Sequence, residues 1–371
     1  MSDVMVYDHN GISVRVCTSP LLELGATDLC RGGILNPAFA RNGVPHIFAR
    51  GDPEPQKGGS ILHFTLIEHG PERRPYIDAA KGIAVAPSED PTAQDCQSVE
   101  DPRAFLRRNP RTGQGELYLV SVAWNGKSRP ELPDEPPDTR NHLCIAYGPD
   151  FSHFERRGIR FDDTPDKDGA IIDIRPDGMT IAARRRMDTE KWMTEIMLAS
   201  EPTGRYRKVA TIPTAYGWTD MRNGVSQFVR YENHYLGMVH GVEETDKGLV
   251  YSCGGALLDL EGRLVALEQD PILKPRLDDE VFGLGGKAVT LATGLDRFSN
   301  GYGNDMLRVW YGRGDWDIGW AEWPIAEYAA YLLQNPIREV GEGTWELADG
   351  RFYRTAQAAS AARRPSYHFA G

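Results

Sequence analysis

The sequence predicts an all-β chain, and two observations favour a β-propeller among the all-β folds. Short apolar runs recur along the 371 residues, separated by Gly, Pro and Asn turn signals. Pairs of such runs also recur at a spacing of several tens of residues, which is the size of a propeller blade. Repeated units of this size favour a propeller. A β-sandwich also fits the pattern.

The individual elements follow from the same signals. We expect strands at 11–17, 44–49, 61–67, 116–123, 142–147, 178–183, 195–199, 226–231, 234–240, 249–260, 307–311 and 318–323. A helix is expected at 324–334, where Pro324 stands in the first turn and apolar residues follow at helical spacing. The Ala-rich segment 356–363 is expected to form a second helix or a frayed tail.

Composition excludes several classes of protein. The chain is 40% hydrophobic, which suffices for a large core, and its formal net charge of −11 argues against nucleic acid or an anionic membrane as partner. No stretch resembles a signal peptide or a membrane span. The cysteines are odd in number and scattered, and no zinc-ligand spacing occurs, so we expect free thiols and no bound metal. These features predict a cytoplasmic protein.

One hexapeptide, SVEDPR at residues 98–103, stands out because two adjacent carboxylates run into a proline and an arginine. Proline fixes an extended or turn conformation, so the charged part is expected at a strand end and not inside a ladder. One interpretation is a surface turn with a local Glu–Arg ion pair. The other is a catalytic acid, Asp101, surrounded by further polar groups.

Four more polar clusters interrupt the β pattern, each expected at a strand end in a different blade. In a propeller such strand ends converge on the central channel and can build a ring-shaped site for a polyhydroxylated ligand. The clusters are Asn36 with Arg50, Lys167-Asp168 with 184–186, Arg222-Asn223 with His240, and 311–315. Taken singly, each has a structural explanation, such as a core histidine for His240 or a turn cap for Asp315.

In their order, these runs resemble glycoside hydrolase family 130, the β-mannoside phosphorylases and related β-mannosidases, over roughly residues 30–325. The runs that carry the resemblance are NPA at 36–38, VEDPR at 99–103, KDGA at 167–170, VHGV at 239–242, YSCGGALLD at 251–259, PILKP at 271–275 and WYGRGD at 310–315. The resemblance implies a five-bladed β-propeller. It also implies a single catalytic domain, with the propeller at about 30–325 and a C-terminal helix and tail at 326–371.

The resemblance further implies roles for individual residues. Asp101 matches the proton donor of the family, which is thought to act through a sugar hydroxyl. The substrate-binding positions are Asn36, Arg50, Arg103, Asp168 and Asp315. The phosphate-binding positions are Arg184, Arg222, His240, Arg140, Asn141 and Lys167, with Arg222 standing where the family has lysine.

The expected reaction is inverting phosphorolysis of a β-mannoside to α-mannose 1-phosphate, with inorganic phosphate as co-substrate and no cofactor. A phosphorylase needs only the acid, because phosphate is itself a competent nucleophile once it is placed and its charge is compensated. An inverting β-mannosidase, the first alternative, needs a second carboxylate as base, for which Glu243 and Glu244 are candidates by position. A non-catalytic carbohydrate-binding propeller is the other alternative. The acceptor sugar, the linkage and the oligomeric state stay open, and a homo-oligomer is compatible with the sequence.

Overall fold

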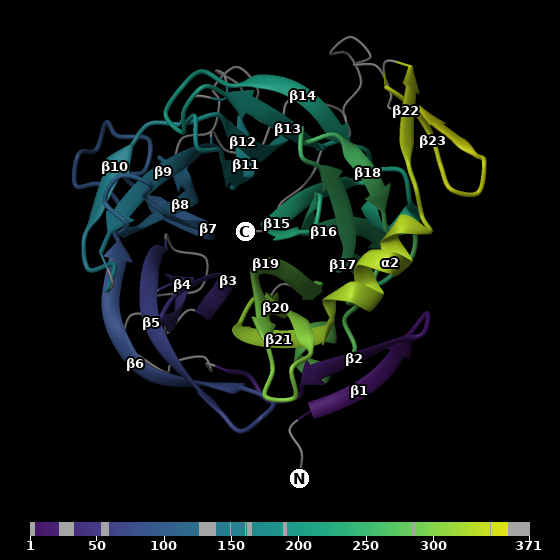
Figure 1. Cartoon of the computed structure of the whole chain (residues 1–371), viewed down its shortest axis with the longest axis horizontal. Helices are drawn as coiled ribbons and strands as arrows, with labels where there is room; N and C mark the ends of the chain where they lie inside the picture. The colour runs from purple at the N-terminus through teal and green to yellow at the C-terminus, as the bar shows by residue number, and fades with distance from the viewer. Residues whose placement is uncertain are drawn as a thin grey trace.

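The protein is described by a computed structural model that covers residues 4–21, 33–52, 59–125, 139–148, 150–159, 161, 165–187, 191–283, 286–341 and 343–354. Its strands form blade-like sheets around a central axis (Figure 1). Blade 1 contains β3 (Gly33–Asn42), β4 (Val44–Asp52), β5 (Ser60–His69) and β6 (Arg74–Val85). Blade 2 contains β7 (Ser98–Arg108), β8 (Gly115–Trp124), β9 (Thr139–Tyr147) and β10 (Phe154–Arg157). Blade 3 contains β11 (Asp166–Ile174), β12 (Thr180–Arg186), β13 (Thr194–Ala199) and β14 (Arg207–Ile212).

The last two blades are joined and include the N-terminal part of the chain. Blade 4 contains β15 (Arg222–Tyr231), β16 (His234–Thr245), β17 (Gly248–Asp259) and β18 (Leu264–Leu267). Blade 5 contains β19 (Ala288–Ser299), β20 (Asp305–Arg313) and β21 (Asp317–Pro324). The N-terminal hairpin of β1 (Val4–His9) and β2 (Ile12–Cys17) adds to blade 5, because β2 pairs with β21. A strand from before the expected propeller boundary near residue 30 therefore closes the ring.

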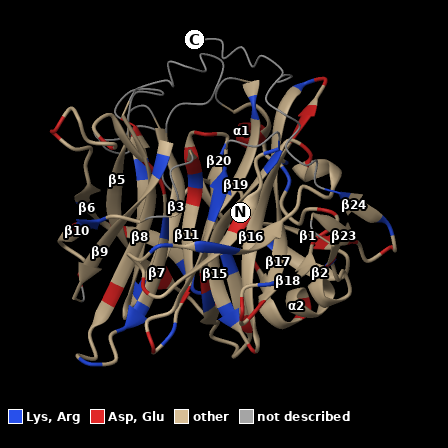
Figure 2. Ribbon diagram, turned by 90° about the horizontal axis from the view of Figure 1, so that it is seen from above, with Lys and Arg blue, Asp and Glu red and all other residues tan. Residues whose placement is uncertain are grey.

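The innermost strand of each blade contacts the innermost strands of both neighbours. β3 contacts β7, β7 contacts β11, β11 contacts β15, β15 contacts β19, and β19 returns to β3 (Figure 1). The five-bladed propeller is thus confirmed and the sandwich is excluded. Charged residues lie along the strands as well as in the loops (Figure 2). Several of those on the innermost strands are buried, among them Asp101, Arg103 and Asp168, so the interior is in part polar.

The polar residues of the innermost strands were expected at strand ends, but they lie inside the strands. Pairing of β7 with β8 shifts between Glu100 and Arg103, which is a β-bulge inside the strand, and Asp101 adopts a φ of 48°. The same shift occurs in β3, where Asn36 has a φ of 49°, and in β11, where Asp168 has a φ of 52°. The expectation of a strand end was therefore wrong, because a bulge lets a polar residue leave the ladder without ending the strand.

Asn and Asp are the non-glycine residues that adopt this left-handed conformation most readily. This explains why the repeated bulge carries Asn36, Asp101 and Asp168 in three successive blades. In blades 4 and 5 the shift in pairing encloses Ser226 and Thr293 instead. The recurring bulge is a structural repeat that places one polar side chain per blade beside the axis.

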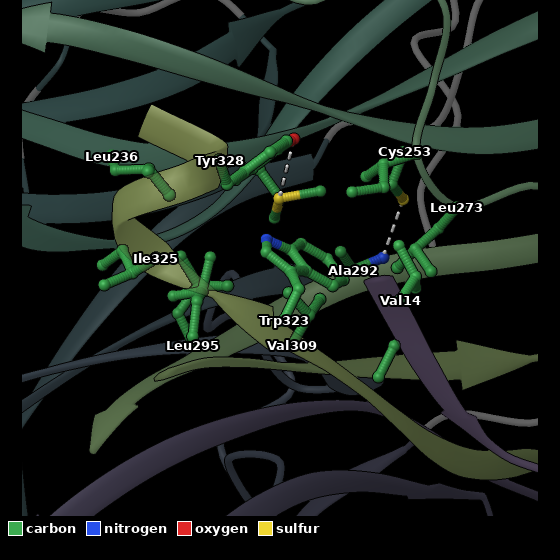
Figure 3. Close-up of a cluster of buried hydrophobic side chains, with 14 of the residues drawn as sticks. Val14, Leu236, Cys253, Leu273, Ala292, Leu295, Val309, Trp323, Ile325 and Tyr328 are labelled. Carbon is green, nitrogen blue, oxygen red and sulfur yellow. Dashed lines mark hydrogen bonds between the residues drawn. The ribbon is translucent and has the colours of Figure 1, made fainter. Parts of the chain in front are cut away.

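The largest hydrophobic cluster holds the closing strand, the last two blades and the C-terminal helix together. It contains Val14 of β2, Cys253 of β17, Trp323 of β21, and Ile325 and Tyr328 of α2 (Ile325–Leu333) (Figure 3). The closing strand and the C-terminal helix are therefore secured by burial of apolar surface, the dominant favourable contribution to folding.

The remaining elements are small. The 3₁₀ helix η2 spans Gly217–Thr219 and α1 spans Asp278–Val281. A three-stranded sheet follows α2, made of β22 (Arg338–Gly341), β23 (Thr344–Glu346) and β24 (Phe352–Arg354). Among the described residues, no helix has the length and apolar character needed to cross a membrane.

Every strand segment expected from the sequence overlaps a strand, and the helix expected at 324–334 is confirmed as α2. The expected segment 356–363 lies outside the described residues. Cys96, Cys144 and Cys253 are free thiols, as expected. The strands that escaped notice include β3, β7, β11 and β19, because the polar, Pro or Gly residues at their bulges break the alternating pattern.

Candidate active site

The carboxylate of Asp101 lies in a cluster of complementary charges, which we call the acid cluster (Asn36, Arg50, Glu100, Asp101 and Lys167). Asn36 Nδ2 donates a 2.6 Å hydrogen bond to Asp101 Oδ1. Arg50 Nη1 lies 3.8 Å from the same oxygen, and Lys167 Nζ lies 4.0 Å from Asp101 Oδ2. Both cations also contact Glu100, at 3.1 Å and 3.5 Å. Asp101 is itself buried, and it reaches this cluster from the bulge in β7.

The charges around Asp101 determine its protonation state. Burial alone would raise the pKa of Asp101, but Lys167, Arg50 and Arg103 outweigh it and hold the pKa below its ordinary value. Burial raises the pKa of Asp315, which feels Lys287, Arg50, Asp101 and Asp52. Asp315 therefore belongs to the same electrostatic environment, in the turn between β20 and β21, with a φ of 61°.

Arg103 joins the acid cluster to a second group of residues. Its Nη1 donates to the main-chain oxygen of Asp101 at 2.7 Å, and its Nη2 donates to Asp168 Oδ1 at 3.1 Å. Its Nε donates to the main-chain oxygen of Val225 at 3.0 Å. All three guanidinium nitrogens are thus occupied and the side chain is fully buried. Arg103 therefore connects the bulge of Asp101 to Asp168, and its expected role in substrate binding stays a prediction.

The second group, which we call the basic cluster (Asp168, Arg185, Arg222 and His240), surrounds the bulge of blade 3. Arg185 Nη1 lies 2.9 Å and His240 Nε2 lies 3.3 Å from Asp168 Oδ2. Burial opposes ionisation of Asp168, but Arg185 above all holds its pKa well below the ordinary value. Burial lowers the pKa of His240, which favours the neutral ring at neutral pH. Arg222 donates to the hydroxyl of Tyr251.

Two residues assigned to phosphate lie elsewhere. Arg184 is fully buried and points to Glu195, with its Nη2 2.8 Å from Oε2, while the next residue, Arg185, reaches Asp168 and His240. Successive strand residues face opposite sides of a sheet, so only one of the pair can point to His240 of blade 4. Arg184 thus lies away from the basic cluster and Arg185 belongs to it, while the phosphate-binding role stays a prediction. Lys167 belongs to the acid cluster beside Asp101, not to the basic cluster.

Arg140 and Asn141 lie at the start of β9, next to β11. The Oδ1 atom of Asn141 accepts a 2.8 Å hydrogen bond from the main-chain N–H of Gly169, which adjoins Asp168. The main-chain N–H of Asn141 donates to Asp166 Oδ1 at 2.8 Å. Burial raises the pKa of Asp166 to about 7, against the charges of Arg184 and Arg140. Asn141 thus borders the basic cluster from blade 2, whereas Arg140 acts on Asp166.

Several buried polar atoms of the site have no hydrogen-bond partner within the described part of the chain. They are Asn36 Oδ1, Asn141 Nδ2, Arg185 Nε, Arg222 Nε and His240 Nδ1. Buried polar groups in folded proteins are nearly always paired, because an unpaired one costs free energy. Their concentration here is typical of a site that completes its hydrogen bonds with a polar ligand.

Gly224 provides the space in which the basic cluster forms. A Cβ atom at this position would lie 2.3 Å from Asp168 Oδ2 and 2.5 Å from His240 Nε2. We therefore expect Gly224→Ala to displace the Asp168 and His240 side chains. The displacement is expected to lower turnover at least about tenfold, because the two side chains would no longer hold a bound ligand in the required orientation. Overpacking costs about 1–3 kcal/mol of stability.

The matched control for this substitution is Gly217→Ala, since a Cβ at Gly217 would meet no atom within 4 Å. Steady-state assays of both purified variants, with their thermal midpoints, test the expectation. Wild-type turnover in Gly224→Ala would contradict it.

Comparison with known proteins agrees with this geometry. Residues 147–332 match the glycoside hydrolase family 130 model, described as beta-1,4-mannooligosaccharide phosphorylase. A beta-1,2-mannobiose phosphorylase from Thermoanaerobacter sp. (strain X514) is 27% identical over 229 residues, which are 61% of this chain and 67% of that protein.

Solved structures share the fold at low sequence identity. The beta-1,2-mannobiose phosphorylase from Listeria innocua, in complex with beta-1,2-mannobiose, superposes with a TM-score of 0.64 at 17% identity, covering 89% of this chain and 99% of that one. A glycosyl hydrolase from Bacteroides ovatus gives a TM-score of 0.59 at 14% identity, covering 82% and 91%. The fold and the family match define a propeller of the glycoside phosphorylase and hydrolase class. The chain belongs to glycoside hydrolase family 130.

Sequence reasoning did not single out Arg185, Trp192 or Tyr251. In the sequence, Arg185 is only the middle one of three consecutive arginines. The strand register decides which face of the sheet each of them points to. Trp192 lies outside the named strands, Tyr251 lies within β17, and neither belongs to a polar motif of the sequence. Their role depends on contacts between blades 3 and 4, which local sequence patterns do not predict.

Proposed function

We propose that this protein is an inverting phosphorylase of β-mannosides, which converts a β-mannoside and inorganic phosphate to α-mannose 1-phosphate and a shortened acceptor. The observation that carries the proposal is the pairing of two clusters: a buried carboxylate, Asp101, fixed by Arg103, and the adjoining Arg185, Arg222 and His240. Arginine is the side chain best suited to bind phosphate through two parallel hydrogen bonds. The phosphorylase activity of the Thermoanaerobacter relative supports the same function.

In the proposed reaction, an oxygen of hydrogenphosphate forms a bond to the anomeric carbon while the bond to the leaving oxygen breaks on the opposite face. The proton of hydrogenphosphate ends on the released hydroxyl, so the reaction balances without a cofactor. Asp101 acts as the general acid for the leaving oxygen, directly or through a sugar hydroxyl. Because its pKa is held low in the free protein, Asp101 must gain its proton in the complex with substrate and phosphate.

The positions of the candidate bases favour phosphorolysis over hydrolysis. An inverting hydrolase needs a second carboxylate to activate water on the far side of the sugar. Glu243 lines a surface groove of about 1050 Å³ together with Trp218, and Glu244 is exposed. His240, by contrast, points to Asp168. Within the part of the chain that the structure describes, neither glutamate forms an ion pair or a side-chain hydrogen bond with the acid cluster or the basic cluster.

The direct test is incubation with β-1,2-mannobiose, β-1,4-mannobiose and a β-mannosyl-glucose, each with and without phosphate. We expect mannose 1-phosphate in the α configuration, detected by ³¹P and ¹H NMR, and cleavage only when phosphate is present. Equal cleavage without phosphate would refute the phosphorylase and point to a β-mannosidase. Loss of that phosphate-independent cleavage in Glu243→Gln or Glu244→Gln would then identify the base.

A further inference from the structure

The indole ring of Trp192 contacts both arginines of the basic cluster. Its ring centroid is 5.7 Å from Cζ of Arg185 and 5.1 Å from Cζ of Arg222. Both distances fall within the range of cation–π contacts, in which the face of the indole attracts a cation. Arg222 also contacts the ring of Tyr251, with its Cζ 5.5 Å from the centroid. The two guanidinium groups thus share one aromatic neighbour.

Like charges at such proximity repel, and the protein must compensate them before any ligand arrives. Burial and the charge of Arg222 both disfavour the charged form of Arg185, whereas Asp168 favours it. Within the described part of the chain, Asp168 forms an ion pair with Arg185 and not with Arg222. Two aromatic side chains act on both cations: the Trp192 ring contacts both guanidinium groups, and Tyr251, which accepts a hydrogen bond from Arg222, also favours the charged form of Arg185. The indole thus contributes attraction to both Arg185 and Arg222.

The backbone of Trp192 is anchored separately from its ring. Its main-chain oxygen accepts a 2.9 Å hydrogen bond from the N–H of Asn223, in a bridge that joins blade 3 to the start of β15. Asn223 Oδ1 also accepts from the N–H of Thr194 at 2.8 Å. A substitution of the Trp192 side chain leaves these bonds available, so the function of the ring can be separated from the attachment of the loop.

We propose that Trp192 is a positioning residue that holds Arg185 and Arg222 together as a preformed anion site and so sets the affinity for phosphate, and not for the mannoside. The inference rests on the proposed phosphorylase function and identifies which inter-blade contact prepares the co-substrate site. A preformed pair of donors avoids the entropy cost of ordering two long side chains on binding.

The test measures phosphate and mannoside affinities separately in Trp192→Leu and Trp192→Phe. In Trp192→Leu we expect the KM for phosphate, and the Kd of inorganic phosphate for the free protein by calorimetry, to rise about tenfold or more. The KM for the mannoside is expected to stay within about twofold. Trp192→Phe keeps an aromatic face and is expected to restore most of the phosphate affinity.

Phe161→Leu is the matched control, because Phe161 makes the equivalent contact with Arg184, at 5.7 Å, on the side of the strand turned away from the basic cluster. It is expected to leave both KM values unchanged. Unchanged phosphate affinity in Trp192→Leu would overturn the inference, as would an increase confined to the mannoside KM, which would indicate a sugar platform.

Phosphate binding and phosphate-dependent turnover of the wild-type protein distinguish a failure of this inference from a failure of the proposed function. Phosphate-dependent turnover in wild type with no selective effect at Trp192 would overturn only the inference. Absence of phosphate binding and of phosphate-dependent turnover in wild type would overturn the proposed function and the inference with it. The thermal midpoint of each variant verifies that the loop remains attached.

Discussion

Asp101→Asn is expected to lower kcat/KM for mannobiose phosphorolysis by roughly 10²–10⁴-fold, the usual contribution of a general acid. The substitution keeps the size of the side chain, and the remaining oxygen can still accept the hydrogen bond from Asn36. The amide cannot deliver a proton to the leaving oxygen. Steady-state kinetics on purified protein, with circular dichroism to verify the fold, measure the effect.

The leaving group provides a sharper form of this test. A nitrophenyl β-mannoside departs with little need for protonation, so the loss in Asp101→Asn should be much smaller on this substrate than on mannobiose. Glu100→Gln is the matched control, since Glu100 contacts the same Arg50 and Lys167 without being the proposed acid. An equal loss on both substrates would refute the role of Asp101 as general acid.

Arg308→Met is expected to destabilise the protein by about 3 kcal/mol, because it removes a buried cation shared by two carboxylates, although Glu68 keeps Arg41 and Glu322 keeps Arg15. Arg308 is fully buried and bridges two blades, with Nη1 2.9 Å from Glu68 of blade 1 and Nη2 3.0 Å from Glu322 of blade 5. Arg41 extends this network to Asp296 of β19. The network therefore crosses the seam at which the ring of blades closes.

Urea denaturation followed by tryptophan fluorescence checks this prediction. Arg263→Met is the matched control, because Arg263 forms its ion pair with Asp259 at the exposed surface, and its midpoint should not move. The double substitution Arg308→Met with Glu322→Gln should recover part of the loss, since it removes one of the two carboxylates that lose a cation in the single variant. A midpoint for Arg308→Met equal to that of the control would show that the network does not stabilise the seam.

The strand predictions succeeded where apolar residues alternate or run together, as in β8, β16 and β17. They failed at β3, β7, β11 and β19, where a bulge holds a polar residue, a proline or a glycine. A bulge interrupts the alternation on which sequence reading relies, although the ladder continues on both sides. The segments that carry the proposed chemistry are therefore the ones that least resemble strands.

The sequence by itself determined the all-β class, the helix at 324–334 and the run of polar motifs that led to Asp101, because these depend on local composition and order. Only the tertiary structure decided that Arg185 and not Arg184 contacts Asp168 and His240, that Arg103 is buried and connects Asp101 to Asp168, and that Lys167 lies beside Asp101. Each of these depends on strand register, since a shift of one residue moves a side chain to the opposite face of the sheet. Register here is set by bulges and by neighbouring blades distant in the sequence, so no local pattern contains it.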